Sequence, residues 1–207
     1  TAVDDLAVYD AAGGSQTMTL DRFSEAAFQP LTLLGIATTS VDGVDWIQVK
    51  LPVQPNGSTG WIRADDVTVT STDLEVRIYL AEHELELLDD GGVVLTTPVA
   101  VGAPESPTPP GVYYVTDPLD FTHNDTGVYG AYALGLSGFS EVLEEFYGGP
   151  PQLAIHGTNK PELIGQSVSN GCIRLPNDAV IELAGLVDLG TPVVILDSRD
   201  APLPALD

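Results

Sequence analysis

The sequence predicts a mainly β fold with a few short helices, divided into a small barrel and a larger β-rich domain. Short apolar runs that alternate with polar residues recur along the chain, and glycine, proline and Asp-Gly turns separate them. Only residues 140–146 and 177–186 carry a helical pattern. At about 150 residues per domain, the 207 residues leave room for one large domain or two small ones.

Residues 1–72 form the predicted barrel. Strand-like composition covers residues 31–36 and 46–51, and an Asp42-Gly43 turn lies between them. A Pro55-Asn56-Gly57 turn then introduces the next strand. Short strands at this spacing are typical of a small barrel of the SH3-like kind. The two tryptophans of this part fit its core or rim better than a ligand platform; they are Trp46 and Trp61.

The second domain is predicted to span residues 74–197, after a polar linker at 68–73 and before a tail at 198–207. The strict alternation of apolar and polar residues from Leu74 to Leu80 marks its first half-buried strand. A proline-rich loop at 104–111 is constrained and non-helical. The remaining predicted strands cover residues 85–88, 93–95, 99–102, 112–116 and 192–196.

Three further segments of this domain have distinct patterns. Residues 121–138 are rich in Gly, Asp and Thr, which predicts a mobile flap. Ser140 begins a short predicted helix that ends before Gly148. Residues 177–186 carry an apolar stripe that predicts a second helix, with Asn177 as its N-cap.

The charge balance excludes several classes of function. Thirty acidic residues against seven basic ones give a formal charge of −23, which excludes a basic surface for nucleic acid or anionic lipid. A hydrophobic content of 43% argues against disorder. No run approaches the roughly 18 apolar residues of a membrane span, and the acidic start does not resemble a signal peptide. We therefore expect a folded chain that is cytosolic, or one whose targeting segment is absent here.

The chemistry-bearing residues gather in one segment. An apolar strand ends at His156 before a glycine turn, and sixteen residues later a second glycine turn carries Cys172. A thiol needs a neighbouring base or cation to become a thiolate, and His156 and Arg174 are the candidates. Backbone N–H groups of Gly171 and Cys172 are candidates for an oxyanion site. A buried inert cysteine, an intermolecular bridge and a hydrogen-bonded core histidine remain open alternatives.

Other polar residues predict no separate site. His83 fits a solvated turn, and His123 lacks a second nearby histidine for a metal. Glu141, Glu144 and Glu145 fit a solvated helix face, with no spacing that argues for paired catalytic carboxylates. We expect no metal and no cofactor.

Two motifs of this segment are distinctive: 156–161 (HGTNKP) and 168–175 (VSNGCIRL), with Ile164-Gly165 between them. Together they resemble the signature of the L,D-transpeptidase catalytic domain, also called the YkuD type, and the resemblance runs from about Leu74 to Leu196. Supporting pieces are 98–102 (PVAVG), 108–111 (TPPG), Tyr129-Gly130 and 134–138 (LGLSG).

The resemblance implies roles for individual residues. Cys172 matches the family's nucleophile, His156 its general base, and Gly157 the residue whose carbonyl orients the imidazole. Arg174 matches the motif's arginine, which would hold the peptide or a carboxylate. Asn170 departs from the histidine that many members carry there, which we interpret as tuning of the pocket. The other implied contributors to substrate binding are Ser169, which would support the turn, Gly171, and Tyr129 in the flap at 129–137.

The implied activity is acyl transfer on peptidoglycan. Cys172 would attack the third residue of a tetrapeptide stem and release D-alanine, and an amine of a neighbouring stem would resolve the thioester into a 3→3 cross-link. Resolution by water would make the enzyme an L,D-carboxypeptidase, and a non-catalytic wall-binding protein is a second alternative. The implied partners are peptidoglycan stems and, as covalent inhibitors, carbapenem β-lactams; the oligomeric state stays open. Such a protein would work in the cell envelope or be secreted, in wall biogenesis and cell shape.

Overall fold

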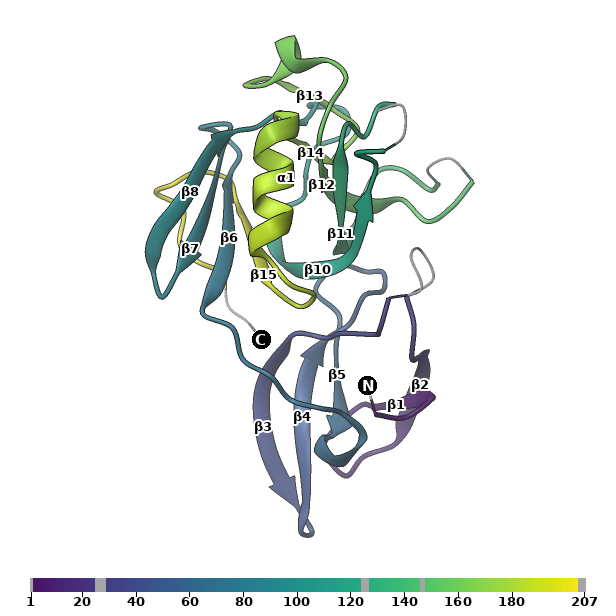
Figure 1. Ribbon diagram of the computed structural model, residues 1–207. Helices are drawn as coiled ribbons and strands as arrows, with labels where there is room; N and C mark the ends of the chain where they lie inside the picture. The colour runs from purple at the N-terminus through teal and green to yellow at the C-terminus, as the bar shows by residue number, and fades with distance from the viewer. Residues whose placement is uncertain (1, 25–28, 124–126, 146–147, 205–207) are drawn as a thin grey trace.

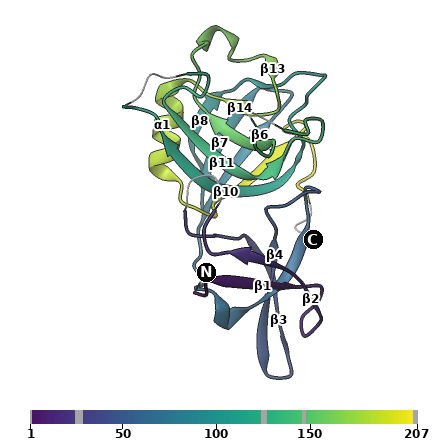
Figure 2. The same ribbon diagram turned by 90° about the vertical axis from the view of Figure 1, so that its right-hand side faces the viewer.

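The computed structural model describes residues 2–24, 29–123, 127–145 and 148–204, and it is mainly β. Figure 1 shows a small sheet below a larger curled sheet that holds the single labelled α-helix in its concave side. Figure 2 shows the same two parts after a quarter turn. None of the described helices is long and apolar enough to cross a membrane.

The N-terminal part is one antiparallel sheet in the order β2-β1-β5-β4-β3. A buried apolar cluster that includes Leu6, Val8 and Ile62 forms its core. Trp46 is 3% exposed and belongs to the interior, whereas Trp61 is half-buried. The similarity of this N-terminal sheet to SH3-like barrels stays a prediction. The strands are β1 (Asp5–Tyr9), β2 (Gln16–Asp21), β3 (Gly35–Val41), β4 (Val44–Lys50) and β5 (Thr59–Arg63), followed by a 3-10 turn η1 (Ala64–Asp66).

One strand of this part was predicted in the wrong place. Residues 31–34 have no strand conformation, and β3 begins at Gly35. Leu31 and Leu33 instead pack their side chains against the apolar cluster, so their hydrophobicity reflects burial rather than strand pairing. The Asp42-Gly43 turn between β3 and β4 is confirmed, with both residues at positive φ.

The second part is an eight-stranded sheet in the order β14-β12-β11-β10-β15-β6-β7-β8. The strand predicted at 192–196 is confirmed in full, and residues 68–73 have no regular structure. Arg199, in the predicted tail, pairs with Glu84 and Glu86 of the sheet. The strands are β6 (Leu74–Tyr79), β7 (Glu84–Asp89), β8 (Gly92–Pro98), β10 (Gly111–Asp120), β11 (Tyr132–Phe139), β12 (Gln152–His156), β14 (Ile173–Arg174) and β15 (Pro192–Leu196).

A helix and two short strands complete this part. The predicted helix is confirmed as α1 (Asn177–Leu186), and its buried residues Val180 and Leu183 pack into the concave side of the sheet. Strand β9 (Val101–Gly102) pairs with β13 (Ser167–Ser169) in parallel. A 3-10 turn, η2 (Pro161–Leu163), lies between β12 and β13.

The predicted flap at 121–138 is wrong for its second half. Residues 132–139 form β11, which is hydrogen-bonded between β10 and β12 and largely buried. Its glycines make room for neighbouring side chains, since a Cβ on Gly138 would lie 2.3 Å from the Tyr113 ring. The glycine content that suggested mobility therefore reflects close packing. Residues 124–126 of the segment lie outside the described residues.

The helix predicted at 140–146 is also wrong over its described part. Residues 141–145 form no helix, although the Ser140 hydroxyl accepts backbone hydrogen bonds from Val142 and Leu143 as a cap would. A short helix needs an apolar face packed on the core, and Val142 is 54% exposed. Phe146 lies outside the described residues.

Candidate active site

The parallel pairing of β12 with β14 brings the predicted residues together. Ile155 pairs with Ile173, and His156 pairs with Arg174. His156 ends β12, while Cys172 immediately precedes β14. Because side chains at matching ends of neighbouring strands lie close together, the fifteen residues between His156 and Cys172 form a loop that returns to its start.

A hollow lies between these residues. Its lining includes His156, Cys172 and Arg174, as the sequence predicted, together with Tyr129 and Asn170. Val128 completes the residues that line it in the described part of the chain, and none of them is a carboxylate. We refer to it as the imidazole hollow.

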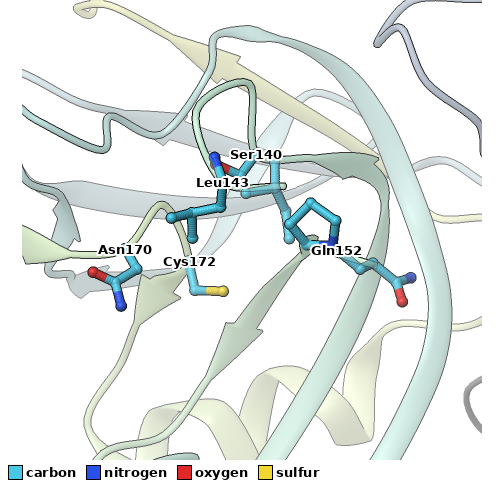
Figure 3. A pocket seen from close by; sticks show the side chains of 7 residues that line it. Ser140, Leu143, Gln152, Asn170 and Cys172 are labelled. Atoms are coloured by element: carbon cyan, nitrogen blue, oxygen red, sulfur yellow. The ribbon is translucent and has the colours of Figure 1, made fainter. Parts of the chain in front are cut away.

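A second hollow lies on another side of the same cysteine. Asn170 and Cys172 line both hollows, so Asn170 stands where the two meet. Figure 3 shows the Cys172 thiol directed into this second hollow, with Leu143 and Gln152 around it. We refer to it as the apolar hollow, after Leu143, Pro151 and Leu153 in its lining; Ser140 completes the set.

A backbone carbonyl fixes the orientation of the His156 ring. The Nδ1 atom lies 2.6 Å from the carbonyl oxygen of Gly157. A carbonyl only accepts, so Nδ1 carries the proton and, in the neutral ring, Nε2 has the lone pair. The Tyr129 ring packs edge-on against the imidazole, with centroids 5.1 Å apart and planes at 72°. Tyr129 in turn stacks on Phe121.

Burial keeps both reactive groups uncharged. Desolvation, with a smaller contribution from the Arg174 cation, lowers the pKa of His156 to about 4, against the opposing effect of backbone hydrogen bonds to Gly157 and Tyr129. Desolvation also raises the pKa of Cys172, although Arg174 and a backbone hydrogen bond with Ala154 act in the other direction. At neutral pH the resting pair is therefore a thiol beside a neutral imidazole.

The cysteine turn is held by hydroxyl groups. The Ser169 hydroxyl donates to the Cys172 carbonyl at 2.5 Å and accepts from the Gly171 N–H at 3.1 Å. Gly171 has a φ of +110°, which favours glycine. The Gly171 N–H is thus committed to the turn, so the oxyanion site predicted from two N–H groups is wrong for Gly171. The Cys172 N–H remains the candidate.

The proline-rich loop supports the same turn, which sequence reasoning missed. Thr108 Oγ1 donates to the Gly171 carbonyl at 2.7 Å and accepts from Gly102 N–H at 2.9 Å. Ser106 Oγ donates to the Ser169 carbonyl at 3.1 Å. Both hydroxyl side chains are buried. Small hydroxyl residues among the prolines were the available signal for this role.

Asn177 was predicted as a helix cap and does something else. Pro176 occupies the N-cap position of α1, and no side chain caps the helix there. The Asn177 Oδ1 atom accepts from the backbone N–H groups of Ala131 (3.1 Å) and Thr158 (3.0 Å), and Nδ2 donates to the Thr158 carbonyl at 3.0 Å. Asn177 thus ties the turn after His156 to the chain entering β11.

Glycines allow this close approach. A Cβ at Gly157 would lie 2.1 Å from Asn177 Oδ1, and one at Gly130 would lie 2.2 Å from the same atom. Gly130 also has a φ of +64°. The two glycines are therefore needed beside Asn177 for steric reasons.

Arg174 is held by its backbone, while the Nε atom of its side chain has no hydrogen-bond partner among the described residues. Its N–H and carbonyl both pair with Ala100. The buried Nε atom makes no hydrogen bond, and no ion pair to Arg174 is present among the described residues. A buried, unpartnered donor on a guanidinium that lines a hollow is suited to an anionic ligand.

The other histidines lie elsewhere. His83, predicted as solvated, is half-buried and hydrogen-bonds to Ser167 Oγ at 2.9 Å, whereas His123 is exposed. Within the described ranges no cluster of three or more His, Cys, Asp or Glu side chains is placed to hold a metal.

Comparison with known proteins identifies the family of the second part of the chain. A family model of the L,D-transpeptidase catalytic domain, named YkuD, matches residues 73–195. The chain belongs to this YkuD family of L,D-transpeptidase catalytic domains.

Two Bacillus subtilis relatives are similar to the chain. The protein YkuD, named for an inferred L,D-transpeptidase activity, is 39% identical over 120 residues, which are 58% of this chain and 64% of YkuD. YqjB, named in the same way, is 36% identical over 125 residues, 56% of this chain and 68% of YqjB. The match thus spans less than two thirds of the length of YkuD.

Solved structures of L,D-transpeptidases are also similar. That of an Enterococcus faecium enzyme, in a Cys→Ser variant, is 26% identical, with a TM-score of 0.47 over 68% of this chain and 54% of the other. The LdtMt1 enzyme in complex with imipenem is 19% identical, with a TM-score of 0.46 over 79% of this chain and 78% of the other.

Replacing Asn177 with alanine is expected to destabilise the protein by about 1–3 kcal/mol, because two N–H groups and one carbonyl lose their partner. Urea unfolding of Asn177→Ala measures the change. Glu182→Ala, at an exposed position of the same helix, is the matched control and should stay within about 0.5 kcal/mol of the parent. Equal stability of the two variants would contradict the role of Asn177.

The protein is expected to become less stable as the pH falls, because His156 titrates at a lower pH in the folded protein than in the unfolded chain. Its pKa is about 4 in the folded protein and 6.5 without the fold, so on acidification the unfolded chain takes up the proton first. Stability is then present above pH 6.5 and is lost as pH falls toward 4, by about 2 kcal/mol between pH 7 and pH 5. Urea unfolding should show a pH 7 to 5 loss smaller by this amount in His156→Gln; an identical loss in both proteins would refute the assignment.

Proposed function

We propose that this protein is a peptidoglycan L,D-transpeptidase in which Cys172 is the nucleophile and His156 the general base. The observation that carries the proposal is the placement of a thiol and a neutral imidazole on one hollow, at the ends of two paired strands. The carbonyl of Gly157 supports the base role, because it holds the proton on Nδ1 and leaves Nε2 to accept another.

The first half-reaction is acylation of the cysteine. As Cys172 Sγ attacks the carbonyl of the third stem residue, its proton passes to Nε2 of His156. The C–N bond to D-alanine breaks, the leaving amine takes the proton from His156, and a thioester remains. The uncharged resting pair implies that proton transfer accompanies attack, since burial disfavours a separate thiolate and imidazolium.

The second half-reaction regenerates the thiol. An amine of a neighbouring stem attacks the thioester carbonyl and gives a proton to His156, and the C–S bond breaks as Cys172 Sγ regains a proton. The product is a 3→3 cross-link. Water in place of the amine would give the L,D-carboxypeptidase reaction at the same site, and a stem dimer against a free tripeptide distinguishes the two products.

Arg174 is assigned the carboxylate of the departing D-alanine. The leaving amine must meet His156, and that carboxylate lies only one carbon from the amine. His156 and Arg174 line the same hollow, so the two ends of the D-alanine reach them together. The buried Nε without a partner supports this assignment.

The remaining site residues shape the hollows. Ser169 and Gly171 form the turn that presents Cys172, Tyr129 packs against His156, and Asn170 borders both hollows. Asn170 adds no second titrating group, so His156 alone would control the proton.

Peptidoglycan lies outside the cytoplasmic membrane, and we therefore propose that the protein works in the cell envelope or is secreted. The N-terminal sheet, which we expect to be SH3-like, would then bind wall or position the enzyme on it. A wall-binding protein without turnover is the alternative from a different class.

A carbapenem is expected to acylate Cys172, because a thiol that opens a stem carbonyl also opens a β-lactam. Intact-protein mass spectrometry should show one adduct with the mass of the drug on the parent protein and none on Cys172→Ala. No adduct on the parent, or an unchanged adduct on Cys172→Ala, would refute a catalytic cysteine and favour the wall-binding alternative.

Arg174→Ala is expected to lower kcat/KM for a tetrapeptide stem by about 10- to 100-fold, the range for a lost hydrogen bond to a charged group. A stem ending in D-alaninamide is the matched substrate. The parent should prefer the free carboxylate, and Arg174→Ala should lose that preference, with Arg174→Lys intermediate. A preference that survives in Arg174→Ala would contradict the assignment.

A further inference from the structure

The N-terminal sheet contacts the catalytic part at the wall of the apolar hollow. Asn56, in the turn between β4 and β5, donates from Nδ2 to the Phe139 carbonyl at 2.8 Å and accepts at Oδ1 from the Phe139 N–H at 2.8 Å. One side-chain amide thereby satisfies both backbone groups of the last residue of β11, as a neighbouring strand would. We call this contact the Asn56 clamp.

The clamp lies next to the apolar hollow in the sequence. Ser140, the next residue, is 2% exposed and lines the apolar hollow, as does Leu143. The Ser140 hydroxyl accepts from the Leu143 N–H at 3.1 Å, and its own N–H donates to the Pro151 carbonyl at 2.8 Å. Because residues 141–145 form no regular element, the clamp at Phe139 sets the point from which this wall departs.

A second contact between the two parts reaches the same hollow. Ser24 donates its hydroxyl to the buried carboxylate of Asp117, whose other oxygen accepts from Gln152 Nε2 at 3.4 Å. Gln152 also donates to the Leu136 carbonyl at 2.9 Å and lines the apolar hollow. Two chains of hydrogen bonds thus run from the N-terminal part to residues that line one hollow, through Phe139 to Ser140 and through Asp117 to Gln152. Figure 3 shows Ser140 and Gln152 among the residues that line it.

The chemistry of the two half-reactions assigns an occupant to this hollow. The leaving amine departs beside His156, and the incoming amine must attack from the same side by microscopic reversibility. The imidazole hollow therefore serves both amines in turn. The acyl part of the donor stem, which stays on Cys172 throughout, is left with the apolar hollow and its Leu143, Pro151 and Leu153 side chains.

We propose that the N-terminal sheet completes the donor site, with Asn56 and Ser24 as positioning residues for the acyl part of the donor stem. The inference rests on the proposed function for its substrate. It gives the N-terminal part a direct effect on donor selection, separate from any binding to the wall.

The kinetic test compares Asn56→Ala with Gln16→Ala in the full chain. Gln16 is an exposed amide on β2 whose hydrogen bonds stay within the N-terminal sheet. Asn56→Ala is expected to raise the donor KM about tenfold, the effect of a lost hydrogen-bond pair, with the acceptor KM and the ratio of amine to water products unchanged. Gln16→Ala should change none of these. An unchanged donor KM, or an equal rise in the acceptor KM, would overturn the proposal.

Hydrogen exchange tests the clamp without turnover. In Asn56→Ala the N–H groups of Phe139, Val142 and Leu143 should exchange faster, while peptides containing His156 keep the exchange rate of the parent. Unchanged exchange at 139–143, or a global increase that indicates loss of fold, would overturn the clamp. A parent protein that never consumes stem donors would refute the proposed function instead, so the two failures are distinguishable.

Discussion

The pairing of β12 with β14 is the constraint on which the site depends. This parallel contact consists of only two residue pairs. They nevertheless set His156 beside Arg174 and fix the position of Cys172, which immediately precedes β14. Ile155 and Ile173, both fully buried, lie at its centre. The apolar core therefore fixes the register, and a one-residue slip of β14 would turn Arg174 to the face of the sheet opposite His156.

Turns that carry reactive groups need support from outside the strands. The cysteine turn is held by hydroxyls of Ser169, Ser106 and Thr108, and the turn after His156 by the amide of Asn177. All four side chains hydrogen-bond to backbone groups of these turns, so the buried turns carry little unsatisfied polarity. The result is a thiol and an imidazole whose positions are set before a ligand arrives.

The sequence predicted many of the strands and the proximity of His156 and Cys172 because those signals are local. Alternation of apolar and polar residues placed β6, and a strand ending at His156 with a glycine turn at Cys172 indicated the candidate site. The predictions failed where contacts between distant residues determine the structure. Gly138 leaves room for the Tyr113 ring, and Leu31 and Leu33 are partly buried without forming a strand. Asn177 hydrogen-bonds to the backbone of two other segments instead of capping its helix. No pattern in a single sequence reports a partner 83 residues away, as Asn56 has in Phe139.

Because the chain is strongly acidic, it matters that Arg174 lies in a hollow without carboxylates among its described lining residues. Among the seven cations, Arg22, Arg77 and Arg199 are paired with carboxylates, and Arg63 lies over the rings of Tyr9 and Trp46. Arg174 faces a hollow whose described lining holds no carboxylate. A carboxylate there would neutralise the guanidinium, repel an anionic ligand and raise the pKa of Cys172 further. The acids can therefore accumulate elsewhere to −23 without weakening the site, provided this hollow stays free of them.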